Sequence, residues 1–293
     1  MTSFRDPLPV RIASADSRRL RWTLPRAGRI GIVWVIAAAF VLCAVLMPPL
    51  VQPLAYHAFA DARSLLGIPN LWNVATNLPF LLVGAAGLRF VSFTRMHPGF
   101  HEPRERTAYA VLFAGVALTC VGSAYYHLAP DNARLVWDRL PMTVGFTAIV
   151  AATLSERVSV NAGVRLLAPL VALGVASVVW WSVSASMGAE NLRPYVFIQF
   201  GSIALVLLIA ALFPSRYTRA GDMVLVVALY AAAKIAEFLD QALYAAGSIF
   251  SGHSGKHLLA AAAVYQILRM LKARTGRDDV AVPGVPGPTP LTR

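Results

Sequence analysis

The chain has 293 residues, of which 57% are hydrophobic and only 14% are charged. Water-soluble domains carry about 25% charged residues, so this composition excludes an ordinary soluble protein and indicates a membrane protein. The formal net charge of +12 could indicate a nucleic-acid partner, but the basic residues are arranged around apolar segments in a way that indicates membrane orientation instead.

The N-terminal part is a basic, polar stretch followed by a long apolar run. We predict a cytoplasmic tail over residues 1–28 and an extra N-terminal transmembrane helix over 29–50. Ile30 to Met47 holds 18 residues without a charge, and about 20 apolar residues cross a bilayer. The alternative is a cleaved signal peptide, since an Ala-x-Ala pattern follows at 58–60. The long basic leader and the length of the apolar run favour an uncleaved helix.

Seven further apolar segments follow, separated by short connections. They lie at roughly 73–92, 108–126, 137–154, 163–184, 194–213, 222–245 and 254–271. No segment shows the alternation that is typical of β-barrel strands. The predicted fold class is therefore an all-α integral membrane protein with eight transmembrane helices. Residues 60–272 form a seven-helix core, and the Pro- and Gly-rich residues 275–293 form a flexible tail.

The basic residues predict the orientation of these helices. With the N-terminus inside, twenty of the 26 Lys and Arg residues lie on the inner side, five lie outside, and Lys234 falls within a span. Cytoplasmic loops carry such an excess of positive charge. We therefore expect a multi-pass protein with both termini cytoplasmic, and we expect no nucleic-acid partner. The Ala- and Arg-rich composition is typical of bacterial sequences and favours a bacterial cytoplasmic membrane.

Three histidines are expected at one membrane depth, near the outer leaflet. His253 and His257 form a His-x-x-x-His pair at the start of the last span, and His127 ends the third span. Residues i and i+4 share a helix face, so the pair can bind one metal ion. A third imidazole would complete a three-histidine zinc set with an open fourth position. For each histidine alone, an ordinary interfacial or helix-terminal side chain is the alternative.

Two polar residues near these histidines are candidates for catalysis. Asp138 begins the fourth span, and Ser123 shares a helix face with His127. Asp138 could accept the proton of a metal-activated water as general base, or it could orient a ligand histidine. Ser123 could donate a hydrogen bond to an oxyanion, or its hydroxyl could bond to a carbonyl of its own helix.

Further polar residues in the apolar segments have supporting roles in this interpretation. Asp240 lies nearest the outer surface and is expected to support the metal site, whereas Lys234 and Glu237 are expected to form a structural ion pair. Asn73 and Asn77 are expected to link neighbouring helices through amide hydrogen bonds.

Several of these motifs resemble, in order and spacing, those of the alkaline ceramidase family, including its alkaline phytoceramidase-like members. The matching pieces, over roughly residues 60–272, are Asn73-Val74-Ala75-Thr76-Asn77, Gly122-Ser123 with His127, Asp138-x-Leu140-Pro141-Met142, Asp240 and His253-x-x-x-His257. Members of this family are seven-helix membrane zinc amidases, so the first span here would be additional. The resemblance implies a prokaryotic-type member that binds zinc through the three histidines, with Ser123 and Asp138 beside the catalytic water.

The resemblance also implies the reaction, namely hydrolysis of a ceramide-like lipid amide to a sphingoid base and a fatty acid. Eukaryotic members share an acidic calcium-binding stretch before their first core helix. Here that region offers only Asp61, Asn70 and Asn73, so the sequence does not support a calcium site. Another lipid amide or ester could be the substrate. Alternative functions are a metal-containing receptor or transporter without hydrolase activity and, less favoured, a haem-binding bundle.

Overall fold

The structure is a computed structural model, and it describes residues 24–93, 97–247 and 251–277. Within these ranges 77% of the residues are helical and none forms a strand. The all-α prediction is therefore confirmed. The predicted tails at 1–28 and 275–293 lie mostly outside the described residues, although the first helix already begins at Arg26.

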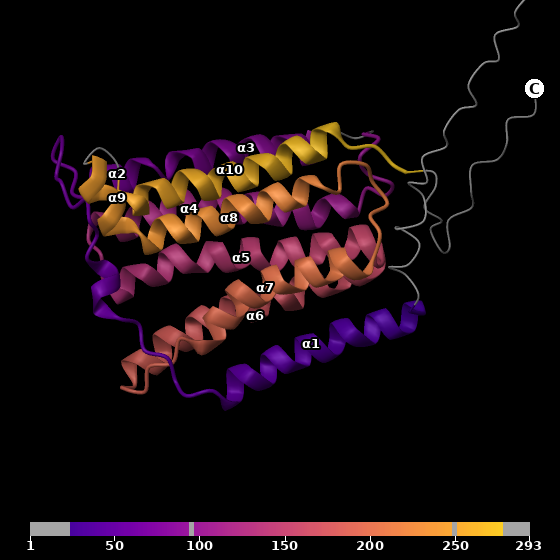
Figure 1. Ribbon diagram of the computed structural model, residues 1–293, viewed down its shortest axis with the longest axis horizontal. Coiled ribbons are helices and arrows are strands. Elements are labelled where there is room, and N and C mark those ends of the chain that lie inside the picture. The colour runs from indigo at the N-terminus through magenta and orange to yellow at the C-terminus, as the bar shows by residue number, and fades with distance from the viewer. Residues whose placement is uncertain (1–23, 94–96, 248–250, 278–293) are drawn as a thin grey trace, which may run out of the picture.

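The described helices form one bundle, shown in Figure 1. The long helices run roughly side by side, and α1 lies at the edge of the bundle against α7. In chain order the elements are α1 Arg26–Leu46, the short 3-10 helix η2 Leu54–His57, α2 Leu71–Ala75, α3 Leu78–Phe93, α4 Glu105–Leu128, α5 Asn132–Arg157, α6 Val160–Ser186, α7 Arg193–Leu212, α8 Asp222–Phe238, α9 Asp240–Gly247 and α10 Gly252–Ala273.

Six helical segments of the described chain are long and apolar enough to cross a membrane. They are α1, the combined segment Leu71–Phe93, α4, α5, α6 and α7. These six candidate spans agree with an α-helical membrane protein, whereas the prediction of eight spans is not confirmed. Of the two remaining predicted spans, α8 has 17 residues and ends with Lys234 and Glu237, and α10 begins with two histidines and a lysine. Both run alongside the other long helices of the bundle (Figure 1).

Two predicted continuous helices are interrupted. The segment at 73–92 is divided into α2 and α3, and the segment at 222–245 is divided into α8 and α9 after Phe238. At the first break Thr76 donates its hydroxyl hydrogen to the Trp72 carbonyl (2.7 Å), and Asn77 donates to the Asn73 carbonyl (2.7 Å). Pro79, which has no N–H to donate, is tolerated in the first turn of α3. The Trp72 carbonyl also accepts a hydrogen bond from the backbone N–H of Thr76 (3.0 Å), whereas the Asn77 side chain takes the place of a backbone donor at the Asn73 carbonyl.

Glycines allow the helices that surround the histidines to approach closely. A Cβ on Gly122 of α4 would lie 2.1 Å from the Trp137 carbonyl oxygen of α5, and one on Gly252 of α10 would lie 2.1 Å from the Ala236 carbonyl oxygen of α8. Helices in membranes commonly pack through such small residues. These contacts set α4 against α5 and α10 against α8 at the end of the bundle that carries the histidines.

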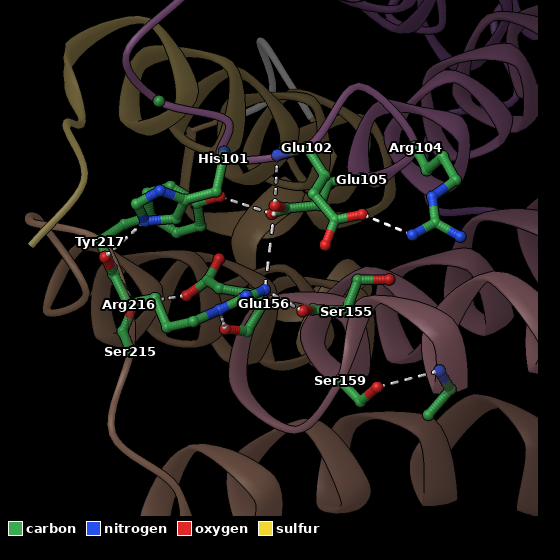
Figure 2. Close-up of polar contacts among 12 residues, drawn as sticks. His101, Glu102, Arg104, Glu105, Ser155, Glu156, Ser159, Ser215, Arg216 and Tyr217 are labelled. Atoms are coloured by element: carbon green, nitrogen blue, oxygen red, sulfur yellow. Dashed lines mark hydrogen bonds and ion pairs between the residues drawn. The ribbon is translucent and has the colours of Figure 1, made fainter. Parts of the chain in front are cut away.

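The opposite end of the bundle carries a buried network of charged residues, shown in Figure 2. Glu105 at the start of α4 accepts a hydrogen bond from the Tyr217 hydroxyl (2.6 Å) and lies 3.8 Å from Arg216. Glu156 at the end of α5 forms an ion pair with Arg274 (2.7 Å). Buried charges of this kind require partners, so the network joins the ends of α4, α5 and α10. It lies about 35 Å from His127, by the length of α4.

Candidate metal centre

Three histidine side chains meet at one end of the bundle. His127 comes from the last turn of α4, and His253 and His257 come from the first turns of α10. One potential ligand atom of each lies within 4.8 Å of those of the other two, and all three residues are buried. The i, i+4 spacing places the α10 pair on one helix face, and the packing of α4 against the start of α10 supplies the third ring. The predicted convergence of the three histidines is confirmed.

The hydrogen bonding of these rings fits a metal ion. Both ring nitrogens of His127 and Nε2 of His253 are buried without a hydrogen-bond partner among the described residues. His257 has its Nδ1 at 2.9 Å from the Thr76 hydroxyl, which leaves Nε2 for another partner. Burying unpaired polar atoms is costly. A cation at the centre of the three rings would give one nitrogen of each a ligand bond, so this cluster could hold a metal ion.

Thr76 is a member of the site that the sequence interpretation did not assign. Its hydroxyl lies between the Trp72 carbonyl, to which it donates, and Nδ1 of His257. Partners of this kind fix the orientation of a metal-binding imidazole. A signal was present in the sequence, because Thr76 lies inside the Asn73–Asn77 motif.

Asp240 supports the site through backbone contacts. One carboxylate oxygen accepts a hydrogen bond from the backbone N–H of His253 (2.7 Å), and the other accepts from the backbone N–H of Ala60 (2.8 Å). Asp240 therefore holds the start of α10 against the segment that carries Phe59. The Phe59 ring packs on two of the histidines, with centroid distances of 4.8 Å to His127 and 4.5 Å to His253. This arrangement shields the cluster from water.

The two asparagines differ in their roles. Asn73 accepts a hydrogen bond from the Ser254 hydroxyl on α10 (2.8 Å) and donates to the Asp61 carbonyl (3.1 Å), so the predicted link between helices is present. For Asn77 the prediction is wrong. Its amide N–H donates to the Asn73 carbonyl within the same segment, and its Oδ1 is buried without a partner in the described chain. The break between α2 and α3 frees that carbonyl, which takes up the Asn77 donor.

The predicted catalytic residues lie beside the histidine cluster. Asp138 and Ser123 are buried, and they line a cavity of about 410 Å³ together with His257. The close approach at Gly122 brings these two side chains together, because Gly122 precedes Ser123 and meets the backbone just before Asp138.

Charged residues of α8 and α10 line the same cavity. The predicted ion pair between Lys234 and Glu237 is present. Lys256, which the sequence interpretation counted only as an outer basic residue, also contacts Glu237 at 2.8 Å. Tyr56 donates its hydroxyl hydrogen to the same Glu237 oxygen at 3.0 Å. Burial raises the pKa of the Tyr56 hydroxyl well above its usual value, so it stays protonated and acts as a donor at neutral pH.

The three residues named in connection with calcium have protein partners. Both oxygens of the Asp61 carboxylate accept hydrogen bonds from Arg63 (2.8 and 2.7 Å), which hold the pKa of Asp61 below its usual value. Asn70 adopts a left-handed backbone conformation and donates its amide to the His127 carbonyl at 2.9 Å. Asn73 bonds to α10 as described. Through Asn70 and Asn73, these contacts hold the segments that carry the histidines in place.

His57 also takes part at this end, although the sequence offered no partner for it. Its Nδ1 lies 2.8 Å from the Tyr126 hydroxyl, and its Nε2 lies 2.9 Å from Asn132 Oδ1. Both ring nitrogens are thus engaged, and His57 lies outside the three-histidine cluster. It ties η2 to the junction between α4 and α5.

No protein-family model matches the sequence, and no curated protein is significantly similar to it. The resemblance to the alkaline ceramidases therefore rests on the sequence motifs alone.

Proposed function

We propose that the protein is a membrane-embedded, zinc-dependent amidase that hydrolyses a ceramide-like lipid amide to an amine and a fatty acid. The observation that carries the proposal is the shared cavity. His257 of the buried three-histidine cluster, the Asp138 carboxylate and the Ser123 hydroxyl all line it. A metal, a carboxylate and a hydroxyl beside an apolar cavity are the groups that hydrolysis of a lipid amide requires.

The donor set favours zinc. Three neutral imidazoles are suitable zinc ligands, and a catalytic zinc site keeps a fourth position open. When bound, zinc supplies the Lewis acidity that allows water to attack an amide at neutral pH. The three rings are held for this purpose by Thr76, by the contacts of Asp240 to the start of α10, and by the packing of Phe59.

Side chains of the protein transfer the protons of the reaction. The Asp138 carboxylate accepts a proton from the attacking water and delivers it to the nitrogen of the leaving amine. The Ser123 hydroxyl donates a hydrogen bond either to Asp138 or to the carbonyl oxygen as that oxygen gains negative charge. Lys256 and Glu237, joined at 2.8 Å, line the same cavity as Asp138 and are charged.

The distribution of basic residues supports an orientation of the protein in the membrane. We propose that α8 with α9, and α10, complete an eight-helix protein with both termini in the cytoplasm. The metal centre then lies near the outer leaflet, where a lipid can enter from the side. The residues at the opposite, inner end include Arg216 and Arg274, in agreement with an excess of basic residues on the cytoplasmic side.

The test compares purified protein with its Asp138→Asn variant on long-chain ceramide, measuring fatty acid release with and without a chelator. We expect the variant to lose at least ~100-fold in rate and to keep the zinc content of the unaltered protein. Asp131→Asn is the matched control, because Asp131 is an exposed carboxylate that caps the same helix. Absence of chelator-sensitive release from ceramide and from other lipid amides and esters by zinc-loaded protein would contradict the proposal and favour a receptor or transporter.

A further inference from the structure

Arg139 has an unusual position for an arginine. It follows Asp138 on α5, its exposed fraction is 5%, and it lines the same cavity as Asp138 and His257. Ionisable side chains buried in a membrane bundle are costly and generally mark a functional interior. The proposed mechanism does not use Arg139.

The surroundings of Arg139 leave one of its nitrogens without a partner. Nη2 donates to the Gln52 side-chain oxygen. The guanidinium packs over the rings of Trp181, Tyr195 and Tyr56, with distances to the ring centroids of 4.4, 4.6 and 5.7 Å. Nη1 is buried without a hydrogen-bond partner, and no carboxylate of the described residues forms an ion pair with Arg139.

Two other buried arginines of the bundle differ from Arg139 in having a carboxylate partner. At the opposite end Arg274 forms an ion pair with Glu156 at 2.7 Å, and Arg216 lies 3.8 Å from Glu105. The protein therefore supplies carboxylates to these buried guanidinium groups and none to Arg139. Asp138 acts on Arg139 only beyond ion-pair distance, and a buried cation without a directly paired anion is unfavourable. An anionic oxygen from a molecule in the cavity would remove this cost at Arg139.

The cavity also indicates which part of such a molecule would reach Arg139. Beyond Asp138 and His257 its lining becomes apolar, as far as Ile149 of α5 and Ile267 of α10. These residues lie about 15 Å farther along their helices. With about 1.25 Å per carbon of an extended chain, from the bond length and angle, this arm holds an acyl chain of about twelve carbons. Arg139 lies at the other end, near the N-terminus of α5.

An acyl amide would therefore lie along the cavity with its carbonyl beside Asp138. The acyl chain would fill the apolar arm, and the amine half would extend toward Arg139, Gln52 and Tyr195. We propose that Arg139 binds a carboxylate on the amine half, so that the preferred substrate is an N-acyl amino acid and not a neutral ceramide. This inference rests on the proposed amidase function, and it changes the favoured amine half from a neutral sphingoid base to one that carries a carboxylate.

The reaction is balanced for such a substrate. Water adds its oxygen and one hydrogen to the acyl carbon, the C–N bond breaks, and the second hydrogen goes to the nitrogen. The products are a fatty acid and an amino acid, and no oxidant or reductant is required. Arg139 touches only the carboxylate of the amine half, so its role is in binding and specificity.

The experiment measures equilibrium binding to the full-length protein in nanodiscs, with a chelator present so that turnover does not intervene. The probes are N-lauroylglycine and N-lauroylethanolamine, which share the acyl chain and the amide and differ in the terminal carboxylate. Because a hydrogen bond to a charged group is strong, we expect the carboxylate probe to bind at least ~10-fold more tightly. Equal binding of the two probes by the unaltered protein would overturn the proposal, whatever any variant does.

Variants then assign the preference to the side chain. Arg139→Gln is expected to remove it without changing the affinity for the neutral probe, whereas Arg139→Lys is expected to keep part of it. Arg134→Gln is the matched control, because Arg134 belongs to the same helix and lies over the Tyr125 ring outside the cavity. Loss of the preference in the Arg134 variant as well would show general charge attraction and would contradict a site at Arg139.

Two further measurements separate the possible outcomes. Free acetate at millimolar concentration is expected not to displace N-lauroylglycine. Displacement would mean that the site holds a free anion, which would overturn the substrate assignment. If the binding preference is present but the zinc-loaded protein hydrolyses neither amide, the proposed amidase function fails while the carboxylate site at Arg139 stands.

Discussion

Replacing His127 by leucine is expected to have opposite effects with and without metal. His127 is fully buried, and both of its ring nitrogens are unpartnered within the described residues. Each such atom costs about 1–3 kcal/mol, so metal-free protein bears about 2–6 kcal/mol at this residue. Leucine removes that cost and introduces a packing mismatch of about 1.5 kcal/mol or less. In chelator, His127→Leu should therefore be more stable than the unaltered protein by about 1–4 kcal/mol.

With zinc the order should reverse. A ligand at a free concentration of 100 times its Kd stabilises the folded state by about 2.7 kcal/mol, and larger excesses add more. The unaltered protein gains this stabilisation, whereas His127→Leu has lost one of three ligands and gains little. The assay is thermal unfolding in detergent with chelator or with zinc, together with the metal content of each protein.

His57→Leu is the control for this comparison. His57 lies at the same end of the bundle, but both of its ring nitrogens have partners. This variant should lose stability equally in both conditions and should keep its response to zinc. The reasoning would be refuted if His127→Leu responded to zinc as strongly as the unaltered protein, or if it lost as much stability in chelator as His57→Leu.

Three further substitutions test other parts of the structure. Thr76→Val removes the hydroxyl at Nδ1 of His257 and should weaken metal affinity about 10- to 100-fold in competition with a chelator; an unchanged affinity would contradict the orienting role. Asn73→Ala loses the hydrogen bond from Ser254 and should lower the free energy of unfolding by about 1–3 kcal/mol, and a change within error would show that this link contributes nothing. Glu156→Gln leaves Arg274 without its ion pair and should destabilise by about 3–5 kcal/mol without altering metal content. Loss of metal in that variant would show that the two ends of the bundle are coupled.

The local features of the metal centre could be derived from the sequence. Composition and apolar segment lengths predicted an all-helical membrane protein, because these depend on residues that are adjacent in the chain. The pairing of His253 with His257 followed from the helix period alone. The predicted topology placed His127 at the same membrane depth as this pair, which indicated it as the third member. Each of these inferences needs only local geometry or the order of motifs.

The breaks in the helices were not predicted. Hydropathy reports the average character of a segment, whereas the interruption after Ala75 depends on which side chain bonds to which carbonyl. For the same reason the predicted hydrogen bond from Asn77 to a neighbouring helix is absent: its amide bonds within its own segment. A polar residue within an apolar segment shows that a partner exists, but the partner is chosen by the neighbouring helix.

The metal centre and the cavity beside it depend on contacts between residues that are far apart in the chain. His127 meets a pair more than a hundred residues later, Thr76 reaches His257, and Arg139 lies between Gln52 and three aromatic rings. From residue order and helix lengths alone, the histidines, a carboxylate and hydroxyls could be predicted to lie at one end of the helices. Tertiary packing decided which nitrogens are left unpaired and which cation faces the cavity, because side-chain partners are set by the close approach of helices and not by periodicity along the chain.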